Sequence, residues 1–209
     1  MPVKRLRDRQ AEATRAQLVS VARELFAAQG YGGTSIEDIA RQAGVAKGAL
    51  YHHFSGKDAL FRAVYEEVLS EAISSVLAAA AAATDPWASV RAGLSAFLDA
   101  CLEPSFRRIV VLESVTVLQQ DVREGDVGRV ELPMLRTVLA PLADGQVLAG
   151  VAVDPLAHVA LGGLYGAALY IARAHDPAAA RREVDAVLDT IVQALGGGTV
   201  PHPERGTRP

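Results

Sequence analysis

The sequence contains one cysteine, Cys101, and only 5% aromatic residues. A single cysteine excludes a disulfide framework within this sequence and fits a reducing compartment, and its position in an apolar stretch favours packing over a redox role. Sheet proteins are enriched in aromatic and β-branched residues, whereas alanine and leucine recur here. We therefore predict an all-α fold and a cytoplasmic location.

The sequence also lacks a convincing targeting or membrane segment. No apolar run follows the basic residues at the N-terminus, so we expect no signal peptide. Residues 156–172 carry no formal charge and approach the length that spans a bilayer. Because this segment is rich in glycine and alanine and contains His158, we predict a buried helix there and no membrane partner.

The net charge of −3 hides a difference between the two ends of the chain. Residues 1–57 contain nine Lys/Arg and five Asp/Glu, whereas residues 58–209 contain twelve Lys/Arg and nineteen Asp/Glu. The N-terminal part is therefore net positive and the remainder net negative. Such asymmetry indicates that the N-terminal part meets a polyanion.

The N-terminal part contains residues that typically begin and end short helices. Residues 1–10 are polar and basic and are predicted to be a disordered arm, after which an apolar helical period runs to Gly30. Thr34-Ser35-Ile36-Glu37 matches a capping box in which Thr34 accepts from the Glu37 amide, and residues 55–58 form a second box that opens a long helix. Gly44 is expected to have a positive φ that ends one short helix before the next.

The two short helices have the spacing of a DNA-binding helix-turn-helix. Lys47 opens the second helix, which is short enough to place its N-terminal end in a major groove. Ile39, Val45 and Leu50 are expected to fix the angle between the helices. We therefore predict a three-helix DNA-binding domain over residues 11–56.

Helix breakers divide the sequence beyond Ala83 into segments of about 15 to 20 residues. Three Asp-Pro pairs, at 85–86, 154–155 and 176–177, each offer a helix cap followed by a first-turn proline. The predicted helices cover residues 86–101, 104–122, 129–142, 155–173 and 177–195. Residues 57–195 thus form a predicted helical domain, and residues 196–209, rich in glycine and proline, a predicted disordered tail.

The run GVAKGALYHHFSGKDAL over residues 44–60 closely resembles the TetR/AcrR family of repressors. The runs FAAQGY at 26–31 and TSIEDIA at 34–40 resemble the same family, so the resemblance covers residues 14–65. It implies a homodimer that binds palindromic double-stranded operator DNA and is released by a small apolar or aromatic effector. It implies neither enzymatic activity nor a cofactor.

The resemblance also assigns roles to positions in the helix-turn-helix. Lys47, Gly48 and His52 would approach base edges, and the other polar positions would contact phosphates. Ala46 and Ala49 stand where the family often has Ser or Thr, which indicates sparse direct readout and a larger part for DNA shape. The predicted DNA-binding residues are Thr34, Ser35, Lys47, Gly48, Ala49, Tyr51, His52, His53 and Lys57.

For residues 57–195 the resemblance implies an effector pocket and a dimer interface. The last two predicted helices, 155–173 with its three glycines and 177–195, would pair with their copies in a four-helix interface, and an intramolecular contact is the alternative. The predicted pocket residues are Trp87, Phe97, Phe106, Val115, Gln119, Leu135, His158, Tyr165 and Leu169.

Other interpretations of these features remain open at this point. His52 and His53 are adjacent and point about 100° apart on a helix, which disfavours a shared metal ion. Tyr51 is either a phosphate contact or a core tyrosine. A further alternative is an enzyme with a DNA-binding head, but we recognise no nucleophile, phosphate-loop or metal motif of an enzyme in this sequence. A ligand-independent activator or architectural protein would differ in having no pocket.

Overall fold

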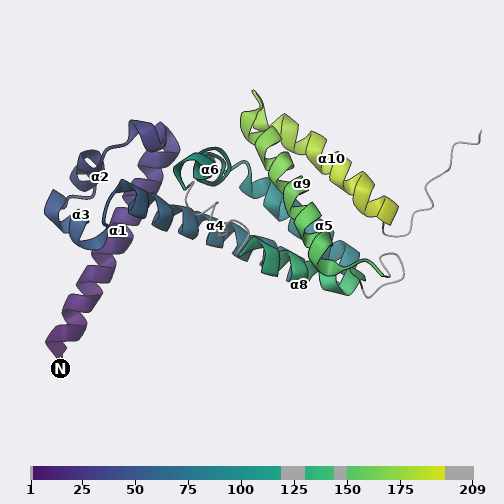
Figure 1. The fold of residues 1–209 in the computed structure, drawn as a ribbon, viewed down its shortest axis with the longest axis horizontal. Coiled ribbons are helices and arrows are strands. Elements are labelled where there is room, and N and C mark those ends of the chain that lie inside the picture. The colour runs from purple at the N-terminus through teal and green to yellow at the C-terminus, as the bar shows by residue number, and fades with distance from the viewer. Residues whose placement is uncertain (1, 119–129, 144–149, 196–209) are drawn as a thin grey trace, which may run out of the picture.

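The computed structural model describes residues 2–118, 130–143 and 150–195 (Figure 1). These ranges contain helices and no strand, which confirms the predicted all-α fold. Gln119 and the predicted tail 196–209 lie outside the described residues. The helices are α1 (Pro2–Gly33), α2 (Ile36–Gln42), α3 (Lys47–His53), α4 (Lys57–Ala81), α5 (Pro86–Ala100), η1 (Phe106–Glu113), α6 (Ser114–Val117), α8 (Glu131–Ala143), α9 (Val153–Arg173) and α10 (Pro177–Leu195).

The first helix differs from its prediction at both ends. It begins at Pro2, so residues 2–10 are helical where a disordered arm was predicted, and Figure 1 shows this part projecting beyond α2 and α3. Proline is tolerated in a first turn, and the Lys, Arg, Gln and Ala residues that follow are good helix formers. At Gly30 the backbone takes φ 77° and ψ 170°, which breaks the helix where its end was predicted before one more turn reaches Gly33.

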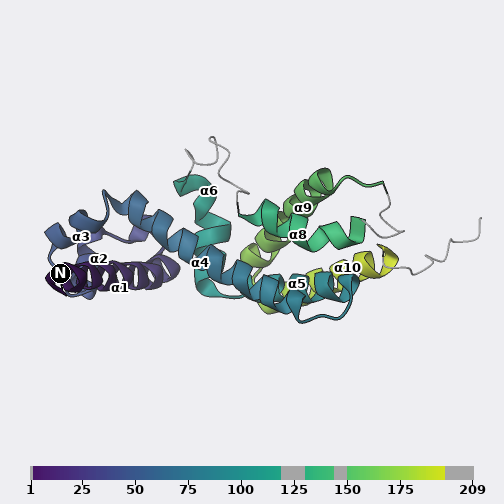
Figure 2. The ribbon, with the colours of Figure 1, turned by 90° about the horizontal axis from the view of Figure 1, so that it is seen from below.

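A long helix, α4, joins the N-terminal head to the C-terminal body (Figures 1 and 2). The head is formed by α1, α2 and α3. In the body, α5 returns along α4, α8 packs on α9, and α10 packs on both α5 and α9. The chain thus places the basic helix-turn-helix at one end and its last two helices at the other.

The predicted boundaries in the body are close to the observed ones. Asp85 and Asp176 accept from the backbone amides three residues on, at 2.9 and 3.0 Å, and so cap α5 and α10 as predicted. Asp154 does not cap α9, because the helix begins at Val153, two residues earlier than predicted, and Ala152 is the cap. The segment predicted as one helix over 104–122 contains instead a π-helix, η1, followed by the short α6.

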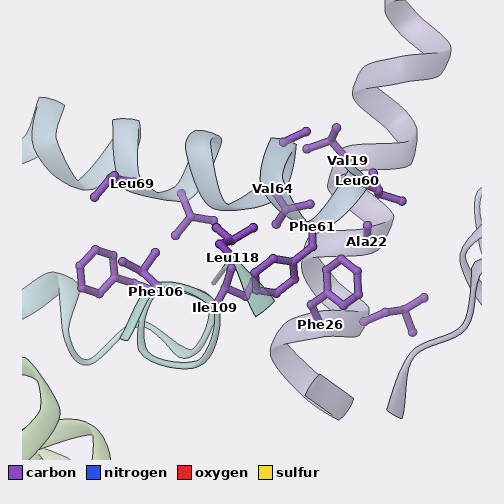
Figure 3. Close-up of a cluster of buried hydrophobic side chains, with 14 of the residues drawn as sticks. Val19, Ala22, Phe26, Leu60, Phe61, Val64, Leu69, Phe106, Ile109 and Leu118 are labelled. Atoms are coloured by element: carbon purple, nitrogen blue, oxygen red, sulfur yellow. The ribbon is translucent and has the colours of Figure 1, made fainter. Parts of the chain in front are cut away.

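One hydrophobic core runs from the head into the body. Phe26 of α1 and Phe61 of α4 meet edge to face at 5.2 Å between ring centroids, and Tyr31 adds a third ring at 5.3 Å from Phe61. Figure 3 shows Phe106 and Ile109 of η1 facing the same stretch of α4. The head is therefore packed against η1 as well as against α4.

A second, smaller cluster lies at the far end of the body, between α8 and the first half of α9. Its buried members are Leu135, Leu139, Leu142 and Ala157. Trp87 of α5 is partly buried against this cluster.

Helix α9 is less buried in the single chain than predicted. We expected residues 156–172 to form a buried helix, but only Ala157, Ala168 and Ile171 of α9 are buried. By length and composition α9 is long and apolar enough to cross a membrane, and 17% of its most apolar window is buried. Much of its apolar surface is therefore left uncovered by this chain.

Candidate nucleic-acid interface and internal cavity

The turn between α2 and α3 has the geometry that the sequence predicted. Gly44 has φ 67°, and the amide of Val45 donates to the carbonyl of Ala40 at 3.0 Å. Ile39 and Leu50 are fully buried and fix the two helices against each other. From α1, Gln17 Nε2 donates to the carbonyl of Ala43 at 2.9 Å, a contact that no local sequence pattern announces.

The cap of α2 is Ser35 rather than Thr34. The Ser35 hydroxyl accepts from the Asp38 amide at 3.1 Å, whereas Thr34 is only 2% exposed and its hydroxyl donates to the carbonyl of Gly30 at 2.8 Å. The break at Gly30 brings that carbonyl within reach of Thr34. The Thr34 hydroxyl, for which a phosphate contact was predicted, is therefore buried and already bonded in this structure.

Lys47 lies at the exposed start of α3, where a base contact was predicted. Its ammonium pairs with the carboxylate of Glu37 on α2 and lies 5.8 Å from the centre of the Tyr51 ring. The hydrogen bond between Lys47 and Glu37 raises the pKa of Lys47 and lowers the pKa of Glu37. Ala46, which precedes Lys47, caps α3 with no side-chain hydrogen bond, as expected for a position that lacks a hydroxyl.

The other predicted positions on α3 differ in exposure. Gly48 and His52 are exposed, Ala49 and His53 are half-buried, and Tyr51 is 49% exposed, which excludes its alternative as a core tyrosine. The two imidazole rings are 5.6 Å apart between centroids. Among the described residues no group of three His, Cys, Asp or Glu is placed to hold a metal ion.

Lys57, a predicted phosphate contact, is partly used inside the head. Its ammonium donates to the carbonyls of Tyr31 at 2.9 Å and Thr34 at 3.0 Å, and lies 4.0 Å from the centre of the Tyr31 ring. The Tyr31 hydroxyl in turn donates to the Asp58 carboxylate, so residues 55–58 form no capping box and Gly56 precedes α4 without a side-chain cap. One proton of Lys57 is left for a phosphate.

The body contains a narrow apolar cavity of about 60 Å³. Four of the predicted pocket residues line it: Phe97, Phe106, Leu135 and Tyr165. The other lining residues are Leu69, Ala72, Ile73, Val76, Val110, Val111, Glu131, Met134, Leu161, Leu164 and Ala168.

Four other predicted pocket residues do not line this cavity. Trp87 packs in the second cluster, Leu169 packs against the main core, and Val115 is half exposed on α6. His158 is exposed, with its Nδ1 2.8 Å from the carbonyl of Asp154. Helical period does not determine which face of a helix turns toward the cavity, because tertiary packing sets the rotation of each helix.

Glu131 and Tyr165 also line the cavity, although the surface that they present to it is apolar, and Ser114 lies beside Tyr165. Burial is the main cause that raises the pKa of the Tyr165 hydroxyl; a hydrogen bond with Ser114 lowers it in part, and the charge of Glu131 raises it again. Glu131 begins α8 and is 8% exposed. Sequence reasoning missed it, because an acidic residue in a first turn is usually a surface helix feature.

The π-helix η1 touches both the cavity and the head. Phe106, Val110 and Val111 line the cavity, and Glu113 at its end accepts from the Tyr31 amide at 2.8 Å. Arg108 Nε donates to the same carboxylate at 3.2 Å. Glu113 thus links η1, which forms one wall of the cavity, to the C-terminal end of α1.

Cys101 is buried in the core of the body. Burial raises the pKa of the Cys101 thiol to about 12, which fits a packed cysteine rather than a reactive one.

The last two helices leave apolar side chains exposed. On α9 and α10, Val159 is 74% exposed, and Tyr170, Val187 and Ile191 are about half exposed. A Cβ built at Gly162, Gly163 or Gly166 would meet nothing within 4 Å.

Two family models match this chain, one in its N-terminal part and one in its C-terminal part. The family model "Bacterial regulatory proteins, tetR family" matches residues 18–64, and "Tetracyclin repressor-like, C-terminal domain" matches residues 87–195. A solved TetR-family transcriptional regulator from Pectobacterium atrosepticum is 33% identical, with a TM-score of 0.77, and the match covers 89% of this chain and 95% of that one.

Two further proteins show how far the similarity extends. The transcriptional activator FasR of Mycolicibacterium smegmatis is 39% identical over 85 residues, which span 41% of this chain and 39% of FasR. The transcriptional regulator FadR from Bacillus subtilis, solved in complex with stearoyl-CoA, shares the fold at 22% identity, with a TM-score of 0.66 over 83% of this chain and 96% of that one. The curated relative is therefore matched over less than half of its length.

Proposed function

Because this chain belongs to the TetR family of transcriptional regulators, we propose that it is a cytoplasmic, homodimeric repressor that binds a palindromic operator and is released by a small molecule. Regulators of this family bind DNA and small-molecule effectors. The observation that carries the proposal is the exposed start of α3 on a rigidly packed head. Neither the family nor these relatives are enzymes.

Lys47 is the residue we expect to reach a base edge. Its present partner, Glu37, is on the neighbouring helix and is itself exposed, so the pair is solvated and inexpensive to open. Phosphates would be repelled by Glu37, which favours a base edge for Lys47 instead. We expect Tyr51 and the remaining proton of Lys57 to donate to phosphates, and we expect no such contact from the buried Thr34 hydroxyl.

The experiment that tests DNA binding uses the full chain and the DNA that flanks its own gene. We expect tight binding to an inverted repeat. The logarithm of the affinity should fall linearly with the logarithm of the salt concentration. Lys47→Met should weaken this binding, whereas Arg182→Met, which removes a cation from the exposed surface of α10, should leave it unchanged. Absence of salt-sensitive binding to any inverted repeat would contradict the proposal.

We assign dimerisation to the exposed faces of α9 and α10. Val159, Val187 and Ile191 supply apolar surface, and the open space around the three glycines of α9 allows a second backbone to approach closely. Such an interface would cover the apolar surface that α9 leaves exposed in the single chain, and an intramolecular role for these faces would not. A twofold axis here would place two α3 helices on one side of a DNA duplex.

Sedimentation of the full chain tests this interface. Val187→Asp should shift the protein from dimer to monomer while its circular dichroism stays helical. Leu77→Asp, which places the same charge at an exposed position of α4, should remain dimeric. A dimeric Val187→Asp protein would contradict the assignment.

Release by an effector would act through η1. A molecule that widens the cavity must displace Phe106, Val110 or Val111, and the Glu113 carboxylate passes that displacement to the Tyr31 amide. Because both recognition helices must keep one spacing to bind a palindrome, a ligand that favours another spacing weakens DNA binding, and DNA weakens the ligand equally.

Thermal unfolding with a panel of small apolar molecules tests this coupling. Compounds that stabilise the protein should weaken its binding to operator DNA. Glu113→Ala should keep the stabilisation and reduce the loss of DNA binding, because the Tyr31 amide then loses its acceptor on η1 while the lining of the cavity is intact. Stabilising compounds that leave DNA affinity unchanged would contradict the proposal and favour a ligand-independent regulator.

A further inference from the structure

An exposed ion pair joins the two helices of the helix-turn-helix. Lys47 opens α3, Glu37 lies in the first turn of α2, and the Lys47 ammonium donates to Oε1 of the Glu37 carboxylate. Figure 1 shows α2 and α3 next to each other in the head, and the two helices are in contact. More than half of each side chain of the pair is exposed. A surface that the Lys47 ammonium reaches is therefore also close to the Glu37 carboxylate.

The other residues around the turn offer little with which to read a base. The Thr34 hydroxyl is buried and donates to a backbone carbonyl, and the Ser35 hydroxyl is used in the cap of α2. Ala46, Gly48 and Ala49 have no polar atom in their side chains. The ion pair is therefore the polar group that the first turn of α3 can present to a base pair.

The pair offers hydrogen-bond donors and acceptors side by side. An ammonium group has three donors, so Lys47 keeps two when one is bonded to Glu37. An ionised carboxylate accepts at about four positions, so Glu37 has capacity for a further donor beside Lys47. The hydrogen bond from Lys47 is the main cause that holds the pKa of Glu37 below its ordinary value, which keeps this carboxylate ionised.

This combination matches a G·C base pair better than a phosphate. A phosphate has only acceptors and is negative, so Glu37 would meet like charge there. In the major groove, guanine presents the neighbouring acceptors O6 and N7, and cytosine presents the N4 amino donor. Lysine is a usual partner of guanine O6 and N7, and glutamate of cytosine N4. An A·T pair also has a donor, adenine N6, but that donor separates the acceptors N7 of adenine and O4 of thymine.

We propose that Lys47 and Glu37 together read one G·C base pair in each half of the operator, with Lys47 donating to guanine and Glu37 accepting from cytosine N4. This inference rests on the proposed function, because it names the base pair that the helix-turn-helix selects. Glu37 is then a specificity-determining residue. Its charge lowers the affinity for phosphates and for base pairs that offer it no donor, and the loss is recovered at the correct base pair.

The test begins with selection of the preferred inverted repeat from a pool of randomised DNA duplexes by the full-length protein. We expect one position in each half-site at which G·C is preferred about tenfold or more over the other base pairs. Glu37→Ala should lose the preference at this position and keep the preferences at the others. Its binding to a scrambled duplex should strengthen, because Lys47 is then free to contact a phosphate. The slope of log affinity against log salt should steepen there by about one for each protomer.

Two further variants locate the effect. Lys47→Met should lose the preference at the same position as Glu37→Ala, because the two side chains read one base pair. Glu24→Ala removes an equal charge from the exposed surface of α1 and should keep every preference of the unchanged protein. A uniform weakening of binding to all sequences by Glu37→Ala would show a structural role for the pair and overturn the assignment.

Modified duplexes test the same contacts without a change in the protein. In N4-methylcytosine a methyl group replaces the amino hydrogen that faces the major groove, and 7-deazaguanine lacks the N7 acceptor. Either base, placed at the selected position, should weaken binding by the unchanged protein about tenfold, the usual effect of losing a hydrogen bond to a charged group. N4-methylcytosine should change the affinity of Glu37→Ala by less than about twofold, because the carboxylate that it blocks is already absent.

The outcomes separate this inference from the function on which it rests. If an inverted repeat is selected but Glu37→Ala keeps the G·C preference, the protein binds operator DNA and the role of Glu37 is wrong. An A·T preference at the position that Lys47→Met changes, or full tolerance of N4-methylcytosine by the unchanged protein, overturns the assignment as well. If no inverted repeat is selected, the proposed function fails and this inference fails with it.

Discussion

The head and the body satisfy their polar groups in different ways. In the head, Gln17, Thr34, Ser35 and Lys57 each bond to backbone atoms of the same chain, and three aromatic rings hold α1 to α4. In the body, the buried Glu131 makes no hydrogen bond or ion pair with another described residue, and α9 leaves apolar surface exposed. The head is complete as a single chain, whereas the body leaves places for a ligand and a second copy.

The largest expected effect comes from a substitution in the core of the head. Phe61→Ala should lower the free energy of unfolding by about 3–5 kcal/mol, because Phe61 is fully buried between Phe26 and Tyr31. Phe97→Ala, beside the cavity and half-buried, should cost about half as much. Urea unfolding at one fixed protein concentration measures both. Equal losses would show that the body is packed as tightly as the head.

A second comparison, within the head, separates a lysine that stabilises the fold from a lysine that is exposed on its surface. Lys57→Met removes a donor from the carbonyls of Tyr31 and Thr34 and should cost about 1–3 kcal/mol of stability. Lys47→Met removes only a solvated surface ion pair and should change stability far less. Chemical unfolding of the two variants side by side measures the difference. A stability loss at Lys47 as large as that at Lys57 would contradict it.

The junction between head and body is tested at Gly30. A Cβ there would lie 2.5 Å from Arg108 Nη2 and from Glu113 Oε1, at a φ that side chains rarely adopt. We expect Gly30→Ala to cost about 2 kcal/mol, since a left-handed φ alone costs roughly 1–2 kcal/mol, and to speed hydrogen exchange of the Tyr31 amide. Gly150→Ala, with φ 83° and open space around it, is the matched control and should show the backbone cost alone.

The smallest effect compares one helix cap in each region. Ser35→Ala and Asp176→Ala should each lower stability by about 1 kcal/mol, the usual contribution of a side-chain cap. Thermal unfolding of both variants gives the values. A neutral Ser35→Ala would indicate that Thr34 takes over the cap, as the sequence suggested.

The helix-turn-helix was predictable because its determinants are local. A glycine at position 44, apolar residues at 39 and 50 and a short helix after the turn are sufficient to specify the motif, and each takes the predicted role. The choice between Thr34 and Ser35 as the cap was not local. It depends on the carbonyl of Gly30, whose direction follows from the broken end of α1.

In the body, the boundaries of the helices were predictable and their rotations were not. Asp85-Pro86 and Asp176-Pro177 mark helix starts by the chemistry of neighbouring residues. Which face meets the cavity depends on residues far along the chain, so of the predicted pocket residues Phe97 lines the cavity and His158 does not. Glu113 was missed for the same reason, since its partner Tyr31 is 82 residues away.

The continuous core across head and body has a consequence for engineering. Regulators of new specificity are built by joining the DNA-binding part of one protein to the sensing part of another, and the gap between the two matched family segments invites a join near residue 65 or 85. In this chain Phe26 and Phe61 face Ile109 of η1, and Tyr31 depends on Glu113. A chimera that keeps the head but replaces η1 would expose an unmatched aromatic surface, so a working fusion has to carry Phe106–Glu113 along with the head.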